Sequence, residues 1–336
     1  MGTLSFETFS KLRVFKKVQI YYSFSIMMHE IVHTNLQGFS VVGLRSPTVE
    51  LFMVPQLGGR IISLKNLKTG REWIWHQDRP DWLWTNRAGD KFGLSPQAGI
   101  DECIPTVAAC TFKGRQLPDH GEVWYEAWDL DPVHLTEGVL TSTVQLSVSP
   151  LKFTRSISLV DERTFLFQYE IENTGTEKEP FIWCIHPLKK VLEGDRLILP
   201  AEVTSIRLDG GIGVPITRGD VWAYPEPYPG IRLDSCQVPG TGTELCVKGF
   251  AGPLQQGFAA IENKHTGDRF EFNWDPTIVP YVGLWVNRGF GSFHHVALEP
   301  CTGIPDSLAI AAQDWKTVKK IAPGTKMRWD LKVTIG

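Results

Sequence analysis

Three side chains that can exchange protons, His120, His186 and Glu299, stand in short segments where a folded core would not need polar residues. The environment of an imidazole or a carboxylate can bring its pKa near neutral pH. A pair of such groups in one cleft could take up one proton while delivering another. The sequence therefore predicts acid–base chemistry, provided that the fold brings these segments together.

Alternation along extended strands decides which neighbours share a face with each candidate. Glu299 shares a face with His295 and lies just before Pro300, where a sheet face can open into a cleft. His186 shares a face with Cys184 and ends an apolar strand. Taken alone, each residue has an equally simple structural interpretation, as an exposed glutamate at a strand end or a hydrogen-bonded core histidine.

A third strand offers a surface suited to a sugar. In residues 281–287, Trp285 and Asn287 alternate with an apolar face. A tryptophan ring can stack on the C–H surface of a sugar, and an asparagine amide can donate to and accept from hydroxyl groups. The same segment could equally be a strand that is buried on both sides.

Strands would have to position these residues, because short extended segments and turn signals follow one another from Phe39 onward without a sustained helical period. The 12 Trp favour pleated surfaces, and the 31 Gly and 22 Pro favour turns between strands. We expect an all-β fold, a large antiparallel β-sandwich of two sheets packed face to face. The clearest expected strands are 49–54, 140–148, 164–171, 181–185, 257–262 and 327–335.

The N-terminal part of the chain differs from the rest. Residues 1–37 lack the alternation and turn signals of the other segments and are predicted to be a disordered extension, which leaves 38–336 as one domain. The apolar run Val18–Met28 is shorter than the roughly 20 residues that span a bilayer. No small-residue cleavage pattern follows this run. We therefore expect no membrane association.

Composition excludes several classes of protein. A formal net charge of -3 supplies no basic field for nucleic acid. The six cysteines form no CxxC pair, which favours reduced thiols in a cytoplasmic protein and disfavours a zinc site. The sequence contains no Walker A loop and no dinucleotide fingerprint, so no cofactor is expected. It does not predict an oligomeric state.

The order of the polar segments resembles the galactose mutarotase-like superfamily, and in particular its aldose 1-epimerase family, over roughly residues 45–335. Each motif is short, but five of them occur in the expected order over nearly the whole domain. The matching segments are Pro55–Leu64 with Gly99–Pro105, His120-Gly121, His186, Pro280–Trp285, and Leu298-Glu299-Pro300.

The resemblance implies an isomerase of carbohydrate metabolism that interconverts the α and β anomers of a hexose or hexose derivative, without a metal or other cofactor. By resemblance, Glu299 is the general base and an imidazolium at His186 is the general acid. The further substrate-binding residues would be His120, Asp275, Asp101, Trp285, Asn287 and Arg60.

Other activities remain compatible with these residues. A glycosidase would use two carboxylates, such as Glu299 and Glu122, and a sugar-phosphate epimerase would share the fold. A non-catalytic carbohydrate-binding protein would keep the sugar contacts but accelerate no reaction. Lys189 and Lys190, which follow His186, would favour an anionic sugar.

Overall fold

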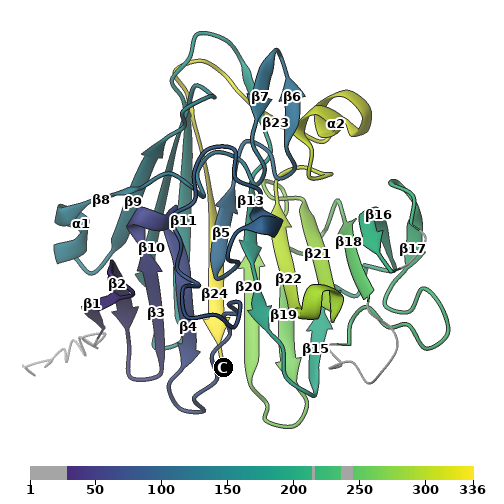
Figure 1. Cartoon of the computed structure of the whole chain (residues 1–336), viewed down its shortest axis with the longest axis horizontal. Coiled ribbons are helices and arrows are strands. Elements are labelled where there is room, and N and C mark those ends of the chain that lie inside the picture. Colours follow the sequence, from purple (N-terminus) through teal and green to yellow (C-terminus); the bar gives the residue numbers. More distant parts are fainter. Residues whose placement is uncertain (1–28, 214–215, 236–244) are drawn as a thin grey trace, which may run out of the picture.

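The structure is a computed structural model that describes residues 29–213, 216–235 and 245–336. Antiparallel strands dominate it, as the sequence predicts, and they form two large sheets (Figure 1). The alternation of buried and exposed side chains explains why these segments form strands: in β10 (Leu151–Leu159) every odd-numbered residue is buried. Such a strand can bury one face only by packing on a second layer.

The first sheet contains 12 strands within the described residues, and it carries the residues of the candidate site. In spatial order its strands are β1 (Glu30–Leu36), β2 (Phe39–Arg45), β3 (Val49–Val54), β4 (Arg60–Asn66), β5 (Ile100–Cys103), β13 (Cys184–Pro187), β22 (His294–Cys301), β21 (Tyr281–Arg288), β18 (Leu245–Ala251), β16 (Ser205–Ile212) and β17 (Val221–Ala223), and β14 (Lys189–Lys190) also pairs with β22.

The second sheet contains eight strands in the same part of the chain. In spatial order they are β15 (Asp195–Ile198), β19 (Phe258–Asn263), β20 (Arg269–Trp274), β24 (Lys326–Ile335), β11 (Thr164–Asn173), β10, β9 (Leu140–Gln145) and β8 (Asp129–Leu130). Apolar side chains of both sheets form the main core between them, including Leu51 and Val286 from the first sheet and Phe153 and Phe272 from the second.

Smaller elements lie at the ends of the sheets. Two further strand pairs are β6 (Cys110–Phe112) with β7 (Arg115–Leu117), and β12 (Glu179–Phe181) with β23 (Lys319–Ile321); the short helices are α1 (Pro132–Thr136) and α2 (Leu308–Ile310). The β6–β7 hairpin and α2 stand together at the top of Figure 1. Among the described residues, no helix is long and apolar enough to cross a membrane.

The predicted strands are found, with two corrections. The segment 181–185 is split between β12 and β13, because Ile182 donates its backbone N–H to Pro105 and Trp183 donates to the hydroxyl of Thr302. The predicted extension is wrong for residues 30–36, which form β1 and pair along their whole length with β2. Most side chains of this edge strand are exposed, so it carries no apolar alternation. Residues 1–28 of the predicted extension lie outside the described residues.

Candidate functional site

A cavity of about 410 Å³ lies on the face of the first sheet that is turned away from the core. Trp285 on β21 and His295 on β22 line it. Their sequence neighbours Val286 and Val296 lie in the core, so alternation along these strands sorts the lining from the core. Other lining residues come from β13, β16 and β18 and from the loops that precede β5, follow β7 and follow β22.

Glu299 on β22 is fully buried beside this cavity, behind lining residues that include Lys248 and His186, and its two oxygens have different surroundings. Oε2 accepts a hydrogen bond from the ammonium of Lys248 and lies 3.3 Å from the sulfur of Cys184. Oε1 lies 3.7 Å from Nε2 of His186 and makes no hydrogen bond within the described part of the chain. Oε1 is therefore the oxygen that remains free to accept a proton.

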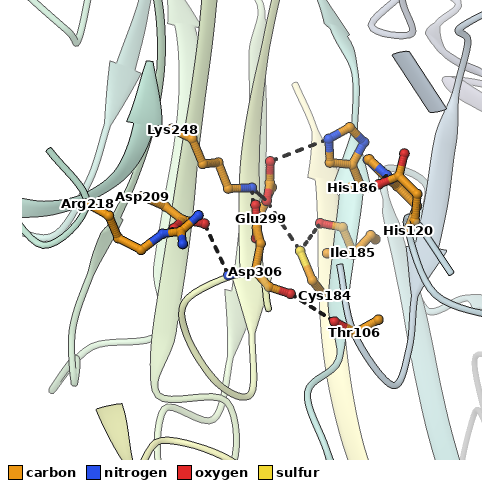
Figure 2. Close-up of polar contacts among 11 residues, drawn as sticks. Thr106, His120, Cys184, Ile185, His186, Asp209, Arg218, Lys248, Glu299 and Asp306 are labelled. Carbon is orange, nitrogen blue, oxygen red and sulfur yellow. Dashed lines mark hydrogen bonds and ion pairs between the residues drawn. The ribbon is translucent and has the colours of Figure 1, made fainter. Parts of the chain in front are cut away.

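Lys248 reaches Glu299 across an intervening strand, since β21 lies between β18 and β22. Gly283 on β21 stands directly opposite Glu299. A Cβ atom at position 283 would lie 3.0 Å from Oε2 of Glu299, closer than such contacts normally come. The absence of a side chain at this position leaves room for the ion pair between Lys248 and Glu299. Lys248 and His186 approach Glu299 from different sides (Figure 2).

His186 on β13 is buried, and burial lowers its pKa well below the usual value, with nearby His120 and Lys248 acting in the same direction. The imidazole is therefore neutral in the free protein, whereas the sequence predicts an imidazolium. Its ring lies 5.1 Å from the ring of His120, measured between centroids. Two of the predicted site residues thus meet at one wall of the cavity.

His120 lies in the loop after β7, with a backbone φ of 57°, in the left-handed region that few non-glycine residues adopt. Its ring stacks on Phe92 with the centroids 4.0 Å apart, and its Nδ1 lies 3.0 Å from a carboxylate oxygen of Asp119. Although burial opposes the shift, the hydrogen bond with His120 lowers the pKa of Asp119. The ring contact and the hydrogen bond to Asp119 hold His120 in the cavity wall.

Trp285, which the sequence predicts to bind a sugar, lines the cavity. Its Nε1–H donates to Nδ1 of His295 over 3.3 Å, and the ring of Trp75 lies 4.5 Å from His295. Burial lowers the pKa of His295 to about 3, so its ring stays neutral and can accept this hydrogen bond. His295 therefore orients the aromatic wall.

Three other predicted residues lie near the site but outside the cavity lining. Arg60 and Asp101 form a buried ion pair, with 2.8 Å between Nε and Oδ1, and Asp101 stands opposite His186 in the strand pairing. The side-chain amide of Asn287 is hydrogen-bonded to the turn after β21. Its Oδ1 accepts from the backbone N–H of Phe290, and its Nδ2 donates to the backbone carbonyl of Phe290. These side chains support the sheet around the site.

Asp275 is not brought to the site. It follows β20 in the second sheet, is exposed, and caps a turn through hydrogen bonds from the backbone N–H and hydroxyl of Thr277. Glu122 also lies outside the cavity lining and accepts two backbone N–H groups, from Val148 and Ser149. Glu122 thus serves as an acceptor for the backbone of residues 148 and 149.

The two lysines that follow His186 in sequence differ in their surroundings: Lys190 is exposed, and neither side chain lines the cavity. Lys189 points into the core, where its ammonium lies 3.6 Å from the ring centroid of Phe270, and burial lowers its pKa well below the usual value. Alternation explains this result, because Lys189 faces away from the side on which His186 lies.

Lys248, Asp306, Asp209 and Arg218 line the cavity and are absent from the sequence prediction. Lys248 carries a detectable signal, since it interrupts an otherwise uncharged strand, Leu245–Ala251. Asp209 lies at a bulge in β16, where the pairing with β18 shifts between Leu208 and Gly210. No comparable pattern marks Asp306, which lies in a loop after β22. Within residues 29–213, 216–235 and 245–336, no three His, Cys, Asp or Glu side chains are grouped so that they could hold a metal ion.

Comparisons with known proteins identify the fold. No protein-family model and no curated protein matches the sequence. Among solved structures, an Escherichia coli K12 protein provisionally described as an aldose 1-epimerase has a TM-score of 0.64 and 14% identity over 92% of this chain and 99% of its own. A Klebsiella pneumoniae protein with the same provisional description has a TM-score of 0.66 and 16% identity over 91% of this chain and 82% of its own.

A galactose mutarotase-like protein of Clostridium acetobutylicum has a TM-score of 0.61 and 14% identity over 91% of this chain and 98% of its own. These likenesses cover nearly the whole chain. The protein therefore has the galactose mutarotase-like β-sandwich fold that the order of its sequence motifs predicts.

Proposed function

We propose that this protein is an aldose 1-epimerase, which interconverts the α and β anomers of a sugar by opening and closing its ring. The observation that carries the proposal is the free oxygen Oε1 of Glu299, which lies 3.7 Å from Nε2 of His186 beside a cavity walled by Trp285. A base and an imidazole beside an aromatic surface are the parts that ring opening requires.

The reaction would proceed by two proton transfers. Glu299 Oε1 takes the proton of the anomeric hydroxyl, and His186 delivers a proton to the ring oxygen as the C1–O5 bond breaks. The aldehyde group then rotates, and the ring closes on its other face with the two roles reversed. Because His186 is neutral in the free protein, the proton that it delivers must first reach it from another group of the site.

The charges of the cavity favour a neutral sugar. Its two strongly basic side chains within the described lining are already paired, Lys248 with Glu299 and Asp306, and Arg218 with Asp209. A phosphate or carboxylate on the substrate would have to displace one of these carboxylates. The volume of about 410 Å³ falls in the range of small-molecule sites, roughly 300 to 1,000 Å³.

We further propose a cytoplasmic location. The five cysteines within the described residues are free thiols, which is typical of a reducing compartment.

The experiment that tests the function is NMR exchange between anomers of freshly dissolved sugars, with a panel of neutral hexoses and their phosphates. We expect accelerated exchange of a neutral hexose. Release of reducing ends from glycosides would instead indicate a glycosidase, and saturable binding without acceleration would indicate a carbohydrate-binding protein. Either result would contradict the proposal.

A further inference from the structure

Three side chains that can carry a charge meet beside the cavity, one basic and two acidic, so their full charges do not balance. The ammonium of Lys248 contacts Oε2 of Glu299 and lies 3.4 Å from Oδ1 of Asp306, so one cation bridges two carboxyl groups. The exposed fraction of the side chain is 8% for Lys248, 0% for Glu299 and 16% for Asp306. A buried cluster with an unbalanced charge is costly. The cluster is electrically neutral only if one of the two carboxyl groups holds a proton.

Other titratable groups that face the cluster are paired elsewhere or neutral. Asp209 forms an ion pair with Arg218, and His120, which lowers the pKa of Asp306, lies 3.0 Å from Asp119. The thiols of Cys103, Cys184 and Cys301 lie on β5, β13 and β22, and burial raises their pKa values well above the usual range, so they are neutral. His186 is neutral for the reason given above. Although burial opposes the shift, Asp306 and Glu299 raise the pKa of Lys248 well above its usual value, so it remains a cation.

The surroundings of the two carboxyl groups decide which one holds the proton. Glu299 has the close contact with Lys248 and a thiol 3.3 Å away, both of which can donate to an ionised carboxylate. Asp306 has the more distant contact with Lys248 and the carboxylate of Asp209 beside it, which accepts its backbone N–H over 3.4 Å. Burial raises the pKa of Asp306 to about 7, with Lys248 opposing and the carboxylates Glu299 and Asp209 adding to the shift.

Hydrogen bonds hold the backbone of Asp306 in place and thereby fix the position of its Cα atom. Its carbonyl accepts a hydrogen bond from the hydroxyl of Thr106 at 3.1 Å (Figure 2). The same carbonyl accepts the N–H groups of Val107 and Ala108 at 2.8 and 2.9 Å. The side chain lines the cavity. A carboxyl group in this position combines access to a bound sugar with a fixed place in the charge cluster.

We propose that Asp306 holds the mobile proton of the site and is the source of the proton delivered to the ring oxygen, and that Lys248 is the positioning residue that couples it to Glu299. The inference rests on the proposed function. On ring opening, Glu299 gains the proton of the anomeric hydroxyl. Asp306 gives up its proton, and His186 relays a proton to the ring oxygen and ends neutral, as it began. The electrons of the C1–O5 bond become a lone pair of the new hydroxyl group while the C1–O1 double bond forms. Ring closure reverses both transfers, so the charge of the cluster never changes.

The first test is the pH profile of anomer exchange catalysed by the wild-type protein and by Asp306→Asn. Activity of the wild type should fall as the pH rises through about 7, because Asp306 must be protonated. Asp306→Asn should lower kcat by about 100- to 10,000-fold and remove this basic limb. Asp209→Asn should keep the limb but move it to lower pH. The exposed Asp275→Asn serves as the matched control and should leave the whole profile unchanged.

A second measurement does not depend on catalysis, namely the ¹³C NMR titration of the Asp306 carboxyl carbon, assigned by its loss in Asp306→Asn. Its midpoint should lie near pH 7 in the wild type and at higher pH in Lys248→Met, which lacks the bridging cation. An active wild type with an Asp306 midpoint near pH 4, or an Asp306→Asn variant with native kcat, would overturn this inference alone. A wild type that accelerates no sugar of the panel would overturn the proposed function and this inference with it.

Discussion

Glu299 is the residue whose surroundings most sharply suit a proton acceptor. The ammonium of Lys248 occupies Oε2, and Oε1 faces His186 without a hydrogen bond within the described structure. A buried carboxylate oxygen without a donor is costly to keep. Under the proposed function, Oε2 makes the supporting contact and Oε1 accepts the proton.

Replacement of Glu299 by Gln should therefore remove catalysis while keeping the size of the side chain. We expect kcat to fall by about 100- to 10,000-fold, the range of general base catalysis, with little change in sugar affinity. His186→Asn should behave alike, and the double variant should lose far less than the product of the two effects, because both groups serve one proton transfer sequence. Saturation kinetics by NMR exchange and calorimetric sugar binding measure both quantities. Near-native exchange in Glu299→Gln would refute the catalytic assignment.

His295 makes a different residue-scale prediction, on stability. Its pKa of about 3 in the folded protein lies below the ordinary value of 6.5, so its stabilising contribution is complete above pH 6.5 and is lost as the pH falls toward 3. His295→Asn keeps an acceptor for the indole N–H of Trp285 and cannot ionise. The free energy of unfolding should therefore fall less steeply with acid in the variant, by about 1.4 kcal/mol per pH unit in this window. Urea unfolding at several pH values measures this slope, and equal slopes in both proteins would contradict the prediction.

At the scale of elements, three neighbouring strands build the charge cluster. Lys248 on β18 and Glu299 on β22 are separated by β21, and the ion pair passes over Gly283. Strand pairing thus sets the distance between the two charged groups, and a glycine on the middle strand determines whether they can meet.

Gly283→Ala should disturb this contact. The new methyl group would lie 3.0 Å from Oε2 and 3.1 Å from Cβ of Glu299, so kcat should fall and the free energy of unfolding should drop by about 1 to 3 kcal/mol. Gly249→Ala on β18 is a matched control, since its methyl group would lie 3.1 Å from the side chains of Ile206 and Leu208 in the core. The control should lose similar stability and retain kcat. Equal losses of kcat in both variants would show that crowding alone explains the effect.

At the scale of the whole molecule, a buried polar network joins the two sheets. Glu102 on β5 of the first sheet accepts hydrogen bonds from Arg155 and Tyr169 of the second, at 3.0 and 3.1 Å, and from the indole of Trp183 at 2.8 Å. Burial raises the pKa of Glu102, and Arg155 opposes the shift. The network holds β5 against the second sheet beside the strand that carries His186.

Arg155→Met should leave this buried carboxylate without its cation and lower the free energy of unfolding by about 3 to 5 kcal/mol. The loss should be larger at pH 8 than at pH 5, because a carboxyl group without its cation is more stable in the protonated form, which is depleted as the pH rises. Adding Glu102→Gln should restore part of the stability. Urea denaturation at both pH values measures these differences. If Arg155→Met alone is as stable as the wild type, the ion pair between Arg155 and Glu102 does not stabilise the packing of the two sheets.

Local patterns in the sequence were sufficient for the fold and for part of the site. Strand alternation and turn residues predict the two-sheet sandwich because each strand must bury one face. Strand β1 was not predicted because most of its side chains are exposed and show no apolar alternation. The same alternation places His186 and Trp285 on the cavity side of their strands. These properties depend only on residues that are close in sequence.

The tertiary structure alone decided which charges meet. Lys248 and Asp306 lie 51 and 7 residues from Glu299 in the chain, and their contacts depend on the order of strands in the first sheet and on a loop anchored at Thr106. It also separated Asp275 from the site, since the turn after β20 belongs to the second sheet. Burial then set the charge of each group, leaving His186 neutral. Desolvation and pairing between distant strands arise only when the chain is folded, so sequence spacing does not encode them.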